Sequence, residues 1–185
     1  MLFKGTDAYY HGQSSYRYVE RLLRRGRELY IVSPYIDAHY ARFIKSISGN
    51  KRIYIISSSM SSDASALLSG GRSPWPAITL SLILVLINYL AWLIHPDLYL
   101  PAASMLVILF SALLFLRKKP GIIRIKKPAA FVHAKMYISE GEAIEGSANL
   151  TYSGMHRNIE GISIVHDGKR IDEMKEHFWR MWKDY

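Results

Sequence analysis

The sequence has no cysteine among its 185 residues, and it is short of acidic side chains. Without cysteine, the chain cannot form a disulfide framework or a cysteine-ligated zinc site. It has 24 Lys and Arg residues against 15 Asp and Glu, which gives a formal net charge of +9. Half of the residues are hydrophobic, so an intrinsically disordered chain is excluded. The composition therefore indicates a basic protein with a folded core.

Charge is missing from one long stretch of the chain. The 44 residues between Arg72 and Arg117 contain a single charged side chain, Asp97. Outside this stretch, about 141 residues carry a net charge of +10. Within it, the uncharged runs 75–94 and 98–116 are each long enough to cross a hydrocarbon core of about 30 Å as a helix.

This pattern predicts a transmembrane helical hairpin over residues 74–119. Amphipathic aromatic residues, Trp75, Trp92 and Tyr99, lie near the ends of the two runs, where such side chains settle at a membrane interface. Two buried core helices are the alternative, but the rest of the chain is too small to cover them. The basic segment 117–119 follows the hairpin and its far turn has no Lys or Arg, so the positive-inside rule places the remaining chain in the cytoplasm.

The residues on either side of the hairpin predict one discontinuous α/β domain, 1–73 with 120–185. Helical spacing of apolar residues predicts helices at 14–25, 38–48 and 169–185. Apolar or alternating runs predict strands at 29–36, 52–58, 122–126, 131–139 and 159–166. Residues 142–145 are expected to lead into one further strand. Strands separated by helices favour an α/β sandwich. No cleavable signal peptide is expected, because residues 1–30 lack a central apolar run.

Three short polar segments carry the candidate chemistry. They are His133-Ala134-Lys135, Gly146-Ser147-Ala148-Asn149 and Asn158-Ile159-Glu160. Because side chains alternate along a strand, His133, Lys135 and Tyr137 are expected on one face, with the intervening residues facing a core. Ser147 and Asn149 share a face for the same reason.

Such a set suits a tetrahedral oxyanion. An imidazole can attack phosphorus while the Lys and Asn side chains bind the non-bridging oxygens. Glu160 is expected to accept a hydrogen bond from the other imidazole nitrogen and so to determine the tautomer.

These segments resemble the HKD motif of the phospholipase D superfamily. That motif runs H-x-K, four residues, D, a spacer of about six residues, then G-S-x-N. Residues 133–135 (HAK) and 146–149 (GSAN) match it, and the pair Asn158 and Glu160 follows where the family often has such residues. Thr151 also falls at a familiar place, and Ser33-Pro34-Tyr35 is similar to part of the family's first core strand.

The chain departs from the motif at one position. Glu140 occupies the place of the Asp, and the spacer to Gly146 is one residue short. In the family that Asp is mostly structural, so we expect the change to affect folding before chemistry.

The resemblance implies a fold, a mechanism and an assembly. The fold is a phospholipase D-like α/β sandwich, a mixed sheet flanked by helices, here interrupted by the hairpin. His133 forms a phosphohistidine, a second His protonates the leaving oxygen, and water hydrolyses the intermediate; no metal or cofactor is implied. The catalytic set is His133, Lys135, Ser147, Asn149 and Glu160. The family uses two motifs per active site and this chain has one, which implies a homodimer sharing one active site.

Three functions are compatible with the sequence. The hairpin slightly favours a membrane-anchored phospholipase whose catalytic domain is cytoplasmic and acts at the lipid bilayer. The alternative is a membrane-tethered, metal-independent endonuclease for DNA or RNA, because short single-motif members are often nucleases and a charge of +10 suits a phosphate backbone. A third possibility is an inactive binding module at the membrane.

Other residues are weaker candidates. Of the remaining histidines, His11 and His156 are weak candidates because each lies in a polar, glycine-containing segment that could border the site. Pairs of basic residues such as Arg24-Arg25 are more typical of a solvated face than of a specific binding site.

Overall fold

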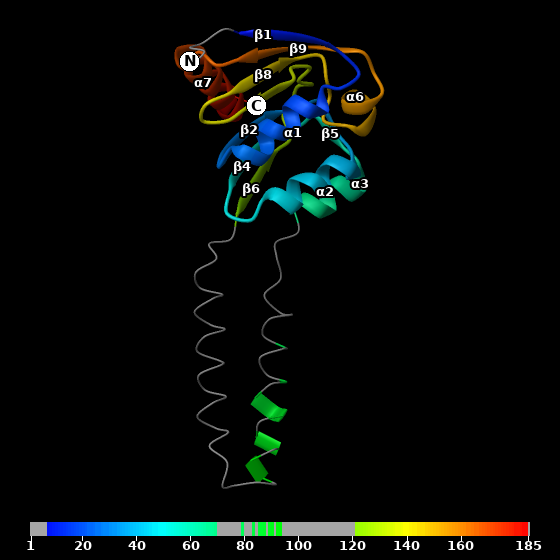
Figure 1. The fold of residues 1–185 in the computed structure, drawn as a ribbon, viewed down its shortest axis with the longest axis vertical. Helices are drawn as coiled ribbons and strands as arrows, with labels where there is room; N and C mark the ends of the chain where they lie inside the picture. The colour runs from blue at the N-terminus through cyan, green and yellow to red at the C-terminus, as the bar shows by residue number, and fades with distance from the viewer. Residues whose placement is uncertain are drawn as a thin grey trace, which may run out of the picture. The chain divides into compact units, whose positions relative to one another are not determined.

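The computed structural model describes residues 7–69, residues 121–184 and nine positions between 79 and 93. The chain divides into two compact units, residues 1–70 with 120–185, and residues 71–119. The first unit contains the α/β domain and is described here by itself (Figure 1).

The expected transmembrane hairpin needs correction. Among the described residues, no helix is both long enough and apolar enough to cross a membrane. The run 98–116 lies outside the described residues, and 75–94 is described only in part. The prediction depended on the lack of charge, which is a property of composition and not of a described helix. The predicted localisation, an integral membrane protein with two transmembrane helices and a cytoplasmic catalytic domain, is therefore wrong.

Seven strands form a mixed sheet in the order β1-β9-β8-β7-β2-β4-β6. They are β1 (Ala8–Gly12), β2 (Glu28–Val32), β4 (Arg52–Ile56), β6 (Ile122–Lys126), β7 (Met136–Ile138), β8 (Ala143–Gly146) and β9 (Glu160–Val165). A separate parallel pair joins β3 (Tyr35–Ile36) to β5 (Ser59–Met60). Strands β2, β4 and β6 are parallel, and β7, β8, β9 and β1 continue the sheet from β2 by antiparallel pairing.

We call the side of the sheet at which β2, β4 and β6 end the carboxyl edge. Antiparallel pairing makes β7 and β9 begin at this edge, whereas β8 and β1 end there. Chain segments that are far apart in the sequence therefore lie next to one another along the carboxyl edge.

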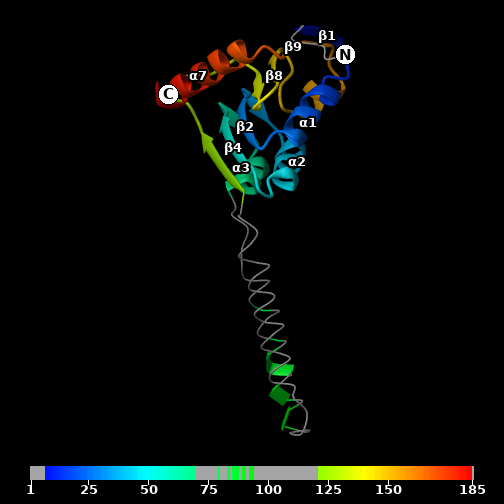
Figure 2. The same ribbon diagram turned by 60° about the vertical axis from the view of Figure 1, so that its left-hand side comes forward.

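Helices cover both faces of the sheet, as Figure 2 shows. One face carries α1 (Tyr16–Arg25), α2 (Ala38–Ile47), α3 (Ser62–Ser69) and α6 (Tyr152–His156), and the other carries α7 (Gly168–Asp184). Alternation along β2 shows the division: Leu29 and Ile31 pack in the first core, whereas Tyr30 and Val32 pack against α7. The expected mixed α/β sheet flanked by helices is confirmed, without the membrane insertion.

Helix α7 illustrates why a long described helix is not a membrane span. Its buried residues recur at helical spacing: Ile171, Met174, Phe178 and Met181. Charged side chains occupy much of the rest of the helix. An amphipathic helix of this kind buries one stripe against a sheet and leaves its other face in water.

A buried cation closes the opposite edge of the sheet. The Lys51 ammonium donates to the backbone oxygens of Leu23, Arg24 and Gly26 at 2.8, 2.5 and 2.6 Å. These oxygens belong to the last turn of α1 and its C-cap, where carbonyl groups lack helical partners. Burial lowers the pKa of Lys51, and all three ammonium donors are used. The contact positions α1 against the start of β4.

We expect Lys51→Met to lower the free energy of unfolding by about 2–4 kcal/mol, because it removes three charge-assisted hydrogen bonds and leaves buried carbonyls without partners. Urea unfolding followed by circular dichroism measures this change. Lys169→Met is the control, since that side chain is 87% exposed and makes one long ion pair. Equal stability of the two variants would contradict the assigned role.

Candidate active site

Three neighbouring strands bring the polar segments of the sequence together at the carboxyl edge. Strand β7 begins there, β8 ends there and β9 begins there, each paired with the next. Residues 133–135 precede β7, residues 147–149 follow β8, and residues 158–160 lead into β9. The structure therefore places the predicted site residues on adjacent strand ends.

The site is at the edge and not on a face of the sheet. Strand β7 begins only at Met136, and Tyr137 is buried in the core beneath the helices, where its hydroxyl donates to the backbone oxygen of Ala148 at 2.7 Å. Burial raises the pKa of Tyr137, so it stays a neutral phenol. The sequence pattern placed His133, Lys135 and Tyr137 on one face of a strand over 131–139. The structure differs, because His133 and Lys135 precede β7 and the Tyr137 side chain is buried in the core.

His133 and Lys135 lie side by side at the carboxyl edge. The Lys135 ammonium lies 3.3 Å from each ring nitrogen of His133 and donates to the His133 backbone oxygen at 2.8 Å. Lys135 is only 6% exposed, whereas His133 is exposed. Burial lowers the pKa of Lys135, and the negative charge of Glu160 acts in the opposite direction. The pair offers an accessible imidazole beside a cation that can bind a phosphate oxygen.

Glu160 is a buried carboxylate with two side-chain donors. Ser147 Oγ donates a short hydrogen bond to Glu160 Oε2, and Asn158 Nδ2 donates to Oε1 at 3.2 Å. The Gly161 amide donates to Ser147 Oγ at 3.1 Å. Glu160 thus connects the strand ends of β8 and β9. The Glu160 carboxylate therefore accepts hydrogen bonds from Ser147 and Asn158. A hydrogen bond from the His133 imidazole to Glu160 stays a prediction.

Asn149 carries an unsatisfied polar atom. Its Oδ1 is buried and has no hydrogen-bond partner in the described structure. A buried polar atom without a partner is uncommon and fits a side chain that completes its bonds with a ligand. Turning the amide about its last bond puts Nδ2 in the same place, where it would donate to a phosphate oxygen.

Two serines that sequence reasoning missed position the site from the neighbouring strands. Ser33 Oγ accepts from the Leu150 amide at 2.9 Å, next to Asn149. Ser58 Oγ accepts from the Val132 amide at 2.8 Å, just before His133. Both serines follow strands that end at the carboxyl edge, so the end of a buried strand was the signal that could have identified them.

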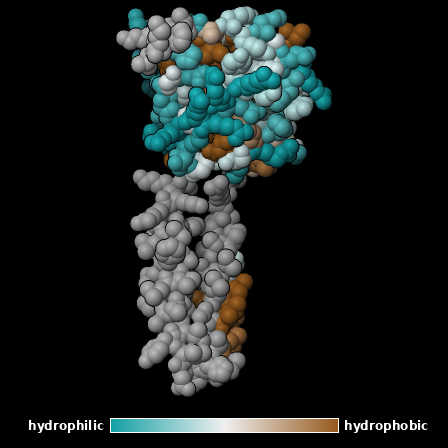
Figure 3. All heavy atoms as spheres, in the orientation of Figure 1, coloured by the Kyte–Doolittle hydropathy of each residue, from teal (hydrophilic) through white to brown (hydrophobic). Residues whose placement is uncertain are grey.

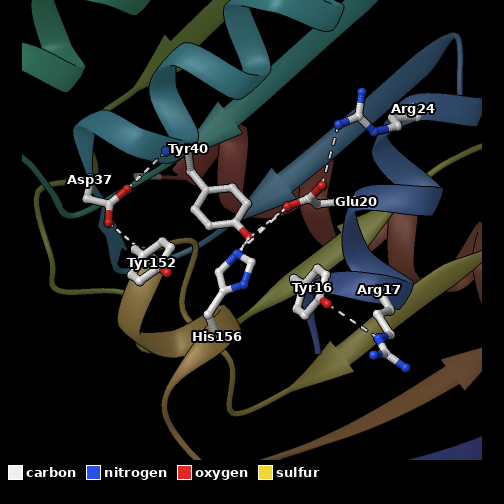
Figure 4. Close-up of polar contacts among 8 residues, drawn as sticks. All are labelled: Tyr16, Arg17, Glu20, Arg24, Asp37, Tyr40, Tyr152 and His156. Carbon is white, nitrogen blue, oxygen red and sulfur yellow. Dashed lines mark hydrogen bonds and ion pairs between the residues drawn. The ribbon is translucent and has the colours of Figure 1, made fainter. Parts of the chain in front are cut away.

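Asp37 positions α6, the helix that follows the Asn149 segment. One carboxylate oxygen accepts from the Tyr40 amide at 3.0 Å and caps α2, and the other accepts from the Tyr152 amide at 2.6 Å at the start of α6. Figure 4 shows Asp37 between these two residues. An Asp before an apolar helical run is an N-cap signature, but its second partner depends on tertiary structure.

An aromatic pair lies next to the imidazole. The rings of Tyr35 and Phe131 are 5.8 Å apart, and that of Phe131 is 6.3 Å from the ring of His133. Tyr35 is 46% exposed and Phe131 is 57% exposed. Flat apolar faces are therefore open to solvent beside the candidate nucleophile.

Glu140 lies at the opposite end of β7 from these residues. Its carboxylate accepts from the Arg27 amide at 3.0 and 3.2 Å and from the Glu28 amide at 2.7 Å. It therefore stabilises the turn between α1 and β2.

Within the described residues, no group of three or more His, Cys, Asp or Glu side chains is arranged to bind a metal ion.

Glu140→Ala is expected to lower the free energy of unfolding by about 1–2 kcal/mol, because two backbone amides lose a charged acceptor at a solvent-exposed turn. Thermal unfolding would show a decrease of a few degrees. The NMR signals of the His133 ring should not move. Glu173→Ala on α7 is the control for removing an exposed carboxylate; a shift of the His133 signals specific to Glu140→Ala would contradict a purely structural role.

One family model matches part of the chain. Residues 110–182 match the family model described as cardiolipin synthase, PLD-like domain. A search of curated proteins returned no match. The family model thus covers the segment from β6 to β9 and the five predicted catalytic residues, His133, Lys135, Ser147, Asn149 and Glu160.

Solved structures share the fold of nearly the whole chain. NucT from Helicobacter pylori has a TM-score of 0.56 at 14% identity, with 97% of each chain covered. The phospholipase D family member Nuc from Salmonella typhimurium has a TM-score of 0.54 at 13% identity, with 96% of this chain and 95% of that one covered. Polyphosphate kinase from Porphyromonas gingivalis has a TM-score of 0.51 at 12% identity, but this chain covers only 26% of it. At these identities the likeness shows the fold alone.

Proposed function

We propose that this chain is a phosphodiesterase of the phospholipase D superfamily that cleaves nucleic acid with His133 as its nucleophile; the match of residues 110–182 to a PLD-like family model supports this. The observation that supports this most directly is the accessible His133 imidazole against the buried Lys135 ammonium. A nucleophile next to a fixed cation is the arrangement that phosphoryl transfer requires.

The proposed reaction has two steps. A ring nitrogen of His133 attacks phosphorus, the bond from phosphorus to the leaving oxygen breaks, and a second imidazole donates a proton to that oxygen. Water then attacks the phosphohistidine, the phosphorus–nitrogen bond breaks, and the second imidazole takes the proton of the water. Lys135 and the Asn149 amide bind the non-bridging oxygens in both steps. Glu160 positions Ser147 and Asn158 at the carboxyl edge through the hydrogen bonds that it accepts from them.

The second imidazole is proposed to be His133 of a second copy. One chain supplies one H-x-K motif, and this motif lies at an open edge where a twofold axis can bring two copies together. Ile159, which lies between two site residues, is 65% exposed. A large exposed apolar side chain beside the site fits a contact between subunits. The proposal is therefore a homodimer that shares one active site.

A nucleic-acid substrate agrees with the charge and with the rings at the site. The chain has a net charge of +9, which favours binding to a polyanion. The exposed Tyr35 and Phe131 rings offer a surface on which a base next to the scissile phosphate can stack. The structures named Nuc and NucT also match this chain over almost their full length, which fits the short single-motif type of the superfamily.

A phospholipid is the second candidate substrate. The matching family model is described as cardiolipin synthase, PLD-like domain, and a phospholipid headgroup is joined by the same phosphodiester chemistry. The same assays separate the two substrates.

We expect His133→Asn to lower the turnover of a single-stranded oligonucleotide by about 10³-fold or more, because the nucleophile is lost. Activity of the wild-type protein should persist in EDTA. The assay offers single-stranded DNA, RNA and phosphatidylglycerol dispersed in detergent under identical conditions.

His177→Asn serves as the control, since this histidine lies exposed on α7. Turnover of lipid but not of nucleic acid would replace the proposed substrate. Full activity of His133→Asn would remove His133 from the mechanism.

Mixed dimers test the shared site. When wild-type and His133→Asn chains are unfolded together in equal amounts and refolded, one dimer in four contains two wild-type subunits. A site that needs both imidazoles then gives about one quarter of the wild-type activity, whereas independent sites give about one half. Mixing with His177→Asn chains should leave full activity. A value near one half for the His133→Asn mixture would contradict the shared site.

A further inference from the structure

Helix α1 carries four arginines that play no part in the site described above. They are Arg17, Arg21, Arg24 and Arg25, and all four are exposed. Their spacing places them along one side of the helix. The opposite side is apolar and is buried in the core through Val19, Leu22 and Leu23. Figure 3 shows that hydrophilic side chains cover most of this view of the domain.

These arginines surround a shallow, solvent-open depression of about 310 Å³ between side chains of α1, which we call the α1 groove. The lining residues are Tyr16, Arg17, Glu20, Arg21, Arg24 and Arg25. The carboxylate of Glu20 is occupied by the Tyr40 hydroxyl at 3.1 Å and by Arg24 at 3.5 Å (Figure 4). Arg21 pairs with Glu142 at 3.0 Å, so Arg17 and Arg25 are the two arginines of the groove that form no ion pair within the described residues. Two carboxylates against four cations leave the groove positive, which favours an anionic occupant.

The beginning of the α1 groove is aromatic. The ring of His156 stacks on Tyr16 at 4.3 Å and on Tyr152 at 4.6 Å, with 21° between the planes in each pair. The guanidinium of Arg17 lies 5.9 Å from the ring centre of Tyr16, and that of Arg157 lies 5.3 Å from the ring centre of Tyr152. Planar cations next to aromatic rings are the elements with which proteins bind single-stranded nucleic acid.

The α1 groove starts close to the active site in the topology. Strand β1 ends at Gly12, which pairs with Glu160 at the carboxyl edge, and α1 begins four residues later. Helix α1 then runs to the other edge, because β2 starts there. Helix α6, which supplies His156, begins three residues after Asn149. A strand leaving the site can therefore follow α1.

We propose that the α1 groove binds the backbone of single-stranded nucleic acid next to the cleaved segment. This inference rests on the proposed function, whose substrate class it narrows. Ten helical residues span about 15 Å, which is long enough to contact more than one phosphate of a strand. In this arrangement the arginines bind phosphates of the strand.

An anionic membrane surface is the other partner that positive charge could attract. Peripheral membrane helices insert apolar side chains beside their basic residues. The apolar residues of α1 are buried in the core, so its solvent face has nothing comparable to insert.

The test measures binding without turnover. The double variant Arg17→Gln/Arg25→Gln is made in the full-length His133→Asn protein, because neither arginine makes an ion pair within the described residues. Binding of a fluorescent 12-nucleotide oligothymidylate is followed by anisotropy at several salt concentrations. Loss of two phosphate contacts should lower the slope of log K against log[salt] by about 1.4, at about 0.7 per contact for single strands.

Arg180→Gln/Lys183→Gln is the matched control, since it removes the same charge from exposed positions on α7, on the other face of the sheet. Its slope should equal that of the parent, and both variants should keep the parent's thermal unfolding midpoint. An unchanged slope in the Arg17/Arg25 variant, or an equal loss in the control, would overturn the inference.

Vesicles of phosphatidylcholine and phosphatidylglycerol form the second arm. If the Arg17/Arg25 variant loses vesicle binding and keeps oligonucleotide binding, the surface is a membrane contact and the inference is wrong. Because binding is measured in the His133→Asn background, the result is independent of whether the wild-type protein cleaves nucleic acid.

Discussion

Both faces of the central sheet are covered by helices, and this constraint decides where chemistry can occur. The first core packs under α1, α2, α3 and α6, and the second packs under α7. A polar side chain directed from the middle of a strand would be buried without water. In the central strands β2 and β7 the mid-strand side chains are buried, and the polar segments gather at the carboxyl edge. The pairing of β7, β8 and β9 then brings His133, Ser147 and Glu160 together from positions that are far apart in the sequence.

Buried charges are the second feature of the domain, and each one is satisfied by named partners. Lys51 closes the last turn of α1 through three backbone oxygens, and Glu160 accepts from Ser147 and Asn158. Lys135 donates to the His133 backbone and has the Glu160 carboxylate in its electrostatic environment. The cost of burying a charge makes such groups rigid, because any displacement breaks several hydrogen bonds at once. Rigidity at Lys135 and Glu160 is useful at a site that must bind an oxyanion.

Much of the architecture could be predicted from local pattern. The helical spacing in α1 and α7 and the apolar runs of β2 and β4 correspond to the observed elements. The membrane prediction failed because the absence of charge was its main support. The face prediction for residues 131–139 failed for a different reason: alternation shows which side chains share a face, but not whether a helix covers that face. Ser33 and Ser58 were missed because their partners, Leu150 and Val132, lie 117 and 74 residues away in the chain.

The sequence by itself determined the chemical identity of the candidate site, because H-x-K, G-S-x-N and N-x-E depend on residue type and short spacing. It also determined the basic charge, which needs only counting. The tertiary structure decided which groups meet: Glu160 with Ser147 and Asn158, Asp37 with two helix starts, and Glu140 with a turn at the far edge. It also placed the four arginines of α1 around one depression on the surface of that helix. The physical reason is that hydrogen bonds and burial act over a few ångströms, and chain folding sets those distances.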